Sequence, residues 1–129
     1  PDVFAQWVEK YQITVLNQTP SAFKQYAAVG QPYHLRYGIF GGEALDIPSV
    51  SHWFEQHSEK QTKLINMYGI TETTVHVTYQ ELSAELLANR IAAPIGEAIP
   101  DLSMYILDQW LQPVPDGMTG ELFISGDGV

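Results

Sequence analysis

The chain has 129 residues and a formal net charge of −9, with 6 Lys and Arg against 15 Asp and Glu. Hydrophobic residues make up 45% of the chain and charged residues 16%, a balance that predicts a globular domain or part of one. The acidic charge disfavours binding along a nucleic-acid backbone or an anionic membrane surface, because both partners require basic patches. Cysteine is absent, so disulfides and thiolate metal sites are excluded. No apolar run is long enough to span a membrane and no signal-peptide pattern opens the chain, so we expect a cytoplasmic protein.

Helical and strand patterns alternate through the first half of the sequence. Apolar residues recur at helical spacing in three segments, and short apolar runs lie between these segments. The expected elements are helices over residues 3–11, 21–30 and 46–58, and strands over residues 13–16, 35–40 and 64–67. We expect Gly30 to end the second helix. This alternation predicts an α/β fold in which parallel strands of an open sheet are joined by βαβ crossovers.

The pattern changes after position 74. The expected elements here are a β-rich segment over residues 75–79, a short acidic helix or surface loop over 81–89, and strands over 103–107 and 120–125. Pro and Gly punctuate the last strands, most clearly in the turn Pro115-Asp116-Gly117. This half predicts a small β-rich unit that forms part of a barrel. We therefore expect a boundary that assigns residues 1–90 to an α/β subdomain and residues 91–129 to the start of a β-barrel subdomain.

A dense polar turn separates the two halves, with the sequence Gly69-Ile70-Thr71-Glu72-Thr73-Thr74. It directly follows a short apolar run, and open α/β sheets place ligands beyond the carboxyl ends of their strands. Gly69 permits a positive φ or the close approach of a ligand. Threonine hydroxyls can donate hydrogen bonds to phosphate oxygens, and the Glu72 carboxylate is a hard ligand suited to Mg²⁺. Taken alone, the pattern also fits a turn that only caps the next element.

The sequence around this turn resembles a known motif. The stretch Asn66-Met67-Tyr68-Gly69-Ile70-Thr71-Glu72 is similar to the adenine- and phosphate-contacting motif of the adenylate-forming superfamily. With its continuation Thr73-Thr74-Val75-His76-Val77-Thr78, it resembles the adenylation domain of non-ribosomal peptide synthetases. Residues 13–23, 35–45 and 95–126 resemble other parts of the same domain. The sequence departs from the usual pattern at Gly38, Ile70 and Asp127, and none of these departures removes a contacting side chain.

The resemblance implies a nucleotide site in the first subdomain. The implied nucleotide-binding residues are Gly42, Glu43, Ala44, Asn66, Tyr68 and Thr71. The Gly42–Ala44 stretch would border adenine, while Asn66 and Tyr68 would fix the base by a hydrogen bond and by stacking. Thr71 would bind phosphate and Glu72 would hold Mg²⁺, which makes these two the expected catalytic residues. Positioning and charge neutralisation are the main requirements for in-line attack at phosphorus, so no nucleophile or general base is needed here.

The resemblance also implies a side-chain pocket for an amino acid. The implied substrate-binding residues are Asn17, Ile39, Gly41, Met67, Val75 and His76. Their apolar walls and the two hydrogen-bonding groups, Asn17 and His76, suit a short β-branched side chain that carries a hydroxyl. Gly41 is expected to leave room for this ligand. The set resembles the specificity pattern of threonine-activating domains, and its structural alternative is ordinary packing at strand ends.

The family's reaction would join the carboxylate of an amino acid to the α-phosphate of ATP and release pyrophosphate. The aminoacyl group would then pass to the phosphopantetheine thiol of a carrier protein. The family's phosphate loop and the pocket aspartate for the α-amino group are expected upstream of this chain. Its ribose-binding aspartate and its catalytic lysine are expected downstream. We therefore expect an internal fragment that is inactive by itself.

Two other functions fit parts of the sequence. One is an acyl- or aryl-activating ligase of the same superfamily, although the Asn-Gln-Thr-Pro-Ser-Ala-Phe run over residues 17–23 argues against it. The other is a non-catalytic α/β binding module with flavodoxin-like topology.

Overall fold

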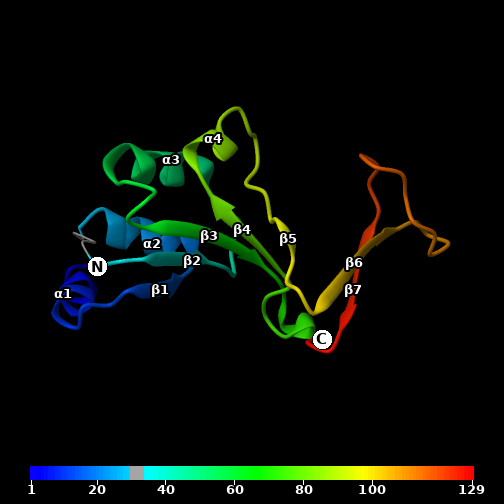
Figure 1. Ribbon diagram of the computed structural model, residues 1–129, viewed down its shortest axis with the longest axis horizontal. Coiled ribbons are helices and arrows are strands. Elements are labelled where there is room, and N and C mark those ends of the chain that lie inside the picture. The colour runs from blue at the N-terminus through cyan, green and yellow to red at the C-terminus, as the bar shows by residue number, and fades with distance from the viewer. Residues whose placement is uncertain (30–33) are drawn as a thin grey trace.

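The computed structural model describes residues 1–29 and 34–129, which form two separate β-sheets with helices packed against the larger one (Figure 1). The helices of the described residues are α1 (Asp2–Lys10), α2 (Pro20–Ala27), α3 (Ile47–Gln56), α4 (Ala84–Leu87) and the 3₁₀ turn η1 (Thr71–Thr73). The strands are β1 (Val15–Gln18), β2 (Tyr37–Phe40), β3 (Lys63–Tyr68), β4 (Thr78–Leu82), β5 (Glu97–Ala98), β6 (Leu102–Leu107) and β7 (Glu121–Gly126). The first five strands lie in sequence order in one sheet, and the last two form the second sheet.

The first three strands are parallel, as the alternating pattern predicts. Strand β2 pairs with β1 on one side and with β3 on the other, so that Leu16, Gly38 and Leu64 lie next to one another in register. Helices α2 and α3 connect these strands. Each helix begins with a side-chain cap and a proline in its first turn, since Thr19 caps α2 and Asp46 caps α3. The expected α/β class is therefore confirmed, whereas the expected role of Gly30 lies outside the described residues.

The chain reverses direction after η1. Strand β4 pairs antiparallel with β3, and β5 pairs antiparallel with β4. The β-rich segment expected over residues 75–79 is in fact a strand over Thr78–Leu82, and the residues before it belong to the turn. Glu81 was expected in a helix or loop but lies in this strand, where its carboxylate accepts a hydrogen bond from Lys63 of β3 at 3.1 Å. Pairing with a neighbouring strand thus overrides the local helical pattern.

Strands β6 and β7 form an antiparallel ladder that extends away from the five-stranded sheet (Figure 1). The sequence Pro115-Asp116-Gly117 lies in the connection between them, as expected, and Gly117 has a φ of 83°. The proposed subdomain boundary between residues 90 and 91 stays a prediction. The structure adds that the five-stranded sheet includes β5, which follows this position in the chain. Among the described residues, no helix is long and apolar enough to cross a membrane.

The helices cover one face of the five-stranded sheet. Strand residues alternate between the two faces, and those facing the helices join the main hydrophobic core. Its buried members are Val8, Leu16, Phe23, Tyr26, Leu35, Phe40, Val50, Trp53, Leu64, Leu82 and Leu87. The opposite face of the parallel strands carries Asn17 and Ile39 in register, and Asn17 is exposed. The sheet therefore has a helical face that holds the core and a second face left open to solvent.

A buried hydroxyl joins β4 to the loop before β5, and its removal should lower stability. Thr78 is fully buried, and its Oγ1 donates a hydrogen bond to the carbonyl of Ile95 at 2.6 Å. Thr78→Val keeps the shape of the side chain but leaves that carbonyl without its partner, so we expect a loss of about 1–2 kcal/mol in the free energy of unfolding. Urea denaturation of the intact domain measures this change. The control Thr14→Val alters an exposed threonine, and an equal loss in both variants would contradict the assignment.

Candidate functional site

The polar turn forms a closed loop between β3 and β4. The backbone N–H of Val77 donates to the carbonyl of Tyr68 at 2.7 Å, and the N–H of Val75 donates to the carbonyl of Ile70 at 3.1 Å. A Cβ placed on Gly69 would lie 1.9 Å from the Val75 carbonyl oxygen, so only glycine fits at this position. The expected requirement for glycine is thus explained by close approach of the loop's own backbone.

The loop places one residue of the expected amino-acid pocket directly against another. A Cβ placed on Gly41, just beyond the end of β2, would lie 2.6 Å from Nε2 of His76. The imidazole therefore packs over the backbone of Gly41. The His76 ring occupies the space that a Gly41 side chain would take, and the expected role of Gly41 in leaving room for a ligand stays a prediction. Gly41 directly follows β2, whereas His76 follows η1, so the fold brings together two residues that are far apart in the sequence.

Three other residues of the expected pocket share the open face of the sheet. Asn17 of β1 pairs in register with Ile39 of β2, which in turn pairs with Ile65 of β3. Met67 lies two residues beyond Ile65 and so points to the same face. Gly41 follows Ile39 by the same interval, just after the strand ends. This face of the sheet and the turn beyond it therefore collect Asn17, Ile39, Met67, Gly41 and His76 at one edge.

Val75 has an unusual backbone. Its φ is 80°, and that of the preceding Thr74 is 56°. A β-branched residue rarely adopts a positive φ, because its side chain clashes with its own backbone. Local strain of this kind persists only where surrounding contacts hold it, and it is found most often at functional sites. Val75 is also 60% exposed, so its side chain is available to line a pocket above the sheet edge.

Two of the expected adenine-binding residues alternate with Met67 along β3. Asn66 is buried, and its Nδ2 donates a hydrogen bond to the carbonyl of Pro94 at 2.9 Å. Tyr68 ends the strand and is exposed. Residues 66 and 68 face the side of the strand opposite to Met67. The Asn66 amide group therefore holds the segment before β5 through Pro94, a contact that no feature of the sequence predicts.

The acidic residue of the expected adenine-bordering stretch is anchored to α2. The Glu43 carboxylate accepts a hydrogen bond from the Ser21 hydroxyl at 3.0 Å and another from the Ser21 backbone N–H at 3.2 Å. These two bonds, the hydroxyl contact first, hold the pKa of the Glu43 carboxyl below its usual value. The Ser21 hydroxyl also lies 3.1 Å from the hydroxyl of Thr19, the capping residue of α2. Ser21 was missing from the expected site residues, because its partner lies 22 positions away in the sequence.

The expected phosphate and magnesium ligands lie on the exposed surface of the turn. Thr71 and Glu72 both belong to η1 and are exposed. Thr73 is turned inward, since its hydroxyl accepts from the backbone N–H of Ile70 at 3.2 Å. Within residues 1–29 and 34–129, no group of three or more His, Asp or Glu side chains could hold a metal ion by itself. One accessible carboxylate fits Mg²⁺, which is commonly bound by one or two carboxylates together with substrate phosphates and water.

Comparison with known proteins decides the family. The family of AMP-binding enzymes matches residues 1–129. A dimodular nonribosomal peptide synthase from Bacillus subtilis (strain 168) is 51% identical over 136 aligned residues, which cover 100% of this chain and 6% of the relative. The chain belongs to the AMP-binding enzyme family. The recognition of a non-ribosomal peptide synthetase adenylation domain from its motifs is thereby confirmed.

Solved adenylation domains share the fold. The N-terminal subdomain of Klebsiella oxytoca NpsA in complex with 3-hydroxybenzoyl-AMSN matches with a TM-score of 0.83 and 25% identity, over 100% of this chain and 33% of that chain. NpsA-ThdA, an artificially fused adenylation–PCP di-domain, matches with a TM-score of 0.84 and 25% identity, over 100% and 24%. The chain spans only 6%, 2% and 22% of the length of three curated relatives.

A cavity on the helical side of this adenylation fold is distinct from the strand-edge site. It has a volume of about 790 Å³ and lies between α2 and α3, where Phe23, Lys24 and Trp53 are among its lining residues. Only Glu43 and Ala44 of the sequence-predicted site residues line it. The other sequence-predicted site residues do not line this cavity.

Proposed function

We propose that the protein containing this chain activates an amino acid with ATP. In this reaction a carboxylate oxygen of the amino acid attacks the α-phosphorus, the bond to the bridging oxygen breaks, and pyrophosphate leaves with the electron pair. The observation that carries the proposal is the meeting of Gly41 and His76 at the sheet edge, next to the loop that presents Thr71 and Glu72. This contact would place the amino-acid side chain beside the turn that is proposed to face the phosphates, as an adenylating site requires.

The residues of the chain would act by binding and positioning. The Thr71 hydroxyl can donate to a phosphate oxygen, and Tyr68 offers an exposed ring on which adenine can stack. The Gly42–Ala44 backbone would border the base. Glu72 would hold Mg²⁺ together with the phosphates, and the ion would supply positive charge where negative charge spreads in the transition state. None of these steps requires proton transfer by a side chain of this chain.

We assign threonine as the preferred substrate. Ile39, Met67 and Val75 supply apolar walls for the substrate's methyl group. Asn17 and His76 are the hydrogen-bonding groups for its hydroxyl. Serine would leave the methyl site empty, which costs about 1 kcal/mol. Valine would leave a polar group of the pocket without a partner, at a cost of about 1–3 kcal/mol.

A carrier protein is the proposed recipient of the aminoacyl group. NpsA-ThdA is an artificial fusion of an adenylation domain and a PCP domain, and all of this chain aligns with part of that structure. The thiol of a phosphopantetheine arm on the carrier would attack the mixed anhydride and displace AMP. This transfer step is not assigned to any of the residues described above.

An aryl-activating ligase is the second candidate function. The matched NpsA subdomain is in complex with 3-hydroxybenzoyl-AMSN, a ligand with an aryl group. We favour an amino acid instead, because the Asn-Gln-Thr-Pro-Ser-Ala-Phe run over residues 17–23 argues against an aryl-activating ligase.

Amino-acid-dependent pyrophosphate exchange on the intact adenylation domain tests the proposal. The panel contains threonine, serine, valine, leucine, phenylalanine and 3-hydroxybenzoate. We expect threonine to give the highest kcat/KM, with serine reduced about 5-fold and valine about 10- to 100-fold. Valine, leucine or phenylalanine ahead of threonine would exclude the assigned substrate. Exchange with 3-hydroxybenzoate alone would replace the amino-acid function by the aryl one.

A further inference from the structure

The loops that follow β1 and β2 are connected by side-chain hydrogen bonds. After β1, Thr19 caps α2 and Ser21 lies in its first turn. After β2, the chain turns through Gly42, whose φ is 82°, and reaches Glu43. The two strands end in register, at Gln18 and Phe40. Both loops therefore begin at the same edge of the sheet.

Glu43 and Ser21 bridge these loops with both atoms of the carboxylate. The Ser21 hydroxyl donates to Oε1 at 3.0 Å, and the Ser21 backbone N–H donates to Oε2 at 3.2 Å. A Cβ added to Gly42 would lie 3.8 Å from Cγ2 of Thr19, so the two loops also lie close together here. The backbone N–H belongs to the first turn of a helix, where an anion is favoured. The bridge fixes the stretch over residues 42–44 against the start of α2.

We infer that Glu43 and Ser21 are positioning residues for nucleotide binding, acting together as a clamp that holds the Gly42–Ala44 backbone where it borders adenine. The inference rests on the proposed function, because it assigns this stretch to the nucleotide. Both oxygens of the carboxylate are engaged with Ser21, which makes a separate polar contact from Glu43 to the base unnecessary. The clamp deepens the proposed function by adding Ser21, a residue outside the expected site.

Steady-state kinetics of the intact domain separate a clamp from a direct contact. We expect Ser21→Ala and Glu43→Ala each to raise the KM for ATP about 5- to 10-fold, with less than about a 3-fold change in kcat, because the lost interaction orders the free enzyme. The double variant should be no worse than either single variant, as for two members of one contact. Glu43→Gln keeps one acceptor oxygen and should recover part of the affinity.

The chain offers a matched control. In α3 the side chain of Asp46 accepts from the hydroxyl and the backbone N–H of Ser49, so Ser49→Ala removes a similar contact that lies within one helix turn. We expect this variant to leave the KM for ATP within about 2-fold of the parent value. An equal rise in Ser49→Ala would show that helix capping alone explains the effect and would overturn the clamp. A rise in Glu43→Ala without one in Ser21→Ala would also overturn it, in favour of direct contact.

Amide hydrogen exchange provides a readout that does not depend on activity. Loss of the clamp should accelerate exchange over residues 42–45 in Ser21→Ala and Glu43→Ala, relative to the parent domain without ligand. Unchanged exchange in both variants would overturn the clamp. Faster exchange in a domain that shows no ATP-dependent activity would support the clamp as a loop contact while refuting the proposed function.

Discussion

Glu72→Gln should lower the rate of adenylation in the intact domain by about 100-fold or more, the scale seen when one electrostatic stabiliser of a transition state is removed. The amide keeps the shape of the side chain but loses the negative charge that would hold Mg²⁺ beside the phosphates. Glu72 is exposed on η1, so its replacement should leave the melting temperature unchanged. Pyrophosphate exchange with threonine, measured over a range of Mg²⁺ concentrations, gives the result.

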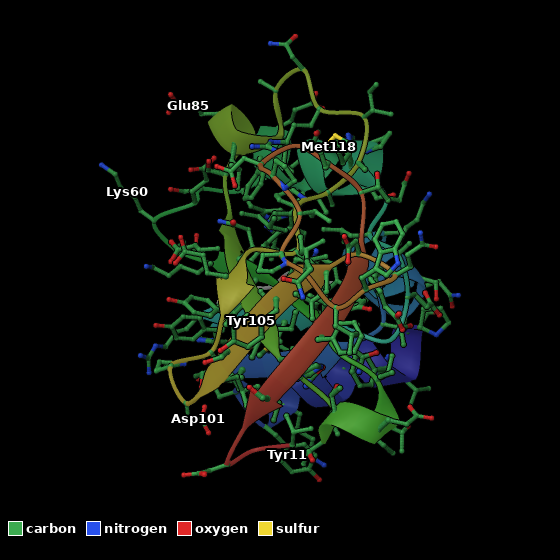
Figure 2. All side chains as sticks on the ribbon, turned by 90° about the vertical axis from the view of Figure 1, so that its right-hand side faces the viewer. Tyr11, Lys60, Glu85, Asp101, Tyr105 and Met118 are labelled. Carbon is green, nitrogen blue, oxygen red and sulfur yellow. The ribbon has the colours of Figure 1, made fainter. Side chains whose placement is uncertain are left out.

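A surface glutamate far from the turn serves as the control. Glu85 is exposed in α4, which lies at the opposite end of β4 from η1 (Figures 1 and 2). Glu85→Gln makes the same change of charge and should retain the parent rate. An unchanged rate in Glu72→Gln, or a large drop in its melting temperature, would contradict the role of Glu72. Partial recovery of the rate at high Mg²⁺ would support weakened metal binding as the cause.

His76→Leu should narrow the preference for threonine over valine by about 10-fold. The leucine side chain can fill the volume over Gly41 but cannot pair with the substrate hydroxyl, so threonine loses a hydrogen bond and valine loses nothing. The ratio of kcat/KM for the two amino acids measures the effect. The KM for ATP should be unaffected and serves as an internal control. A preference that stays the same would remove His76 from the pocket.

Gly41→Ala displaces the same imidazole without removing it. The added Cβ would lie 2.6 Å from Nε2 of His76, so the ring must move away from its position over the sheet edge. We expect threonine activation to fall about 10-fold and valine activation to change little, because the hydroxyl partner is misplaced. In the His76→Leu background the same Gly41→Ala change should have a different effect on threonine, since the two residues are in contact. Additive effects would contradict the contact.

The fold class and the polar turn after β3 follow from local sequence. Periodic apolar residues predict α1, α2 and α3, and the proline and capping residues at Thr19 and Asp46 mark two helix starts. Gly69 and the threonine-rich run predict a turn after β3. These features are encoded within short segments of the chain, where the spacing of apolar residues and the choice of turn residues determine the backbone conformation. The motif around that turn was also enough to identify the family.

The departure at Gly38 shows where local sequence is insufficient. A β-branched residue is usual in this strand, but a Cβ on Gly38 would lie 2.8 Å from Cδ2 of Leu64 and 3.4 Å from Cε2 of Phe23. A larger residue here would press on the side chains of Leu64 and Phe23, so its fit depends on how far a neighbouring strand and a helix can adjust. The same reason placed Glu81 in β4 rather than in a helix, since pairing with β3 decides its conformation. Such contacts join residues that lie too far apart in the sequence to be predicted from a short segment.

The site itself shows the same division. The residue types near Thr71, Glu72 and His76 can be recognised from the sequence, because they belong to a family motif. Only the tertiary structure shows that His76 lies over Gly41, that Asn66 donates to Pro94 and that Glu43 binds Ser21. Short-range spacing fixes which chemical groups enter a turn, whereas the packing of separate loops at one sheet edge fixes which of those groups meet. The sequence therefore determined which chemical groups are available at this turn, and the tertiary contacts decided which of them lie against one another.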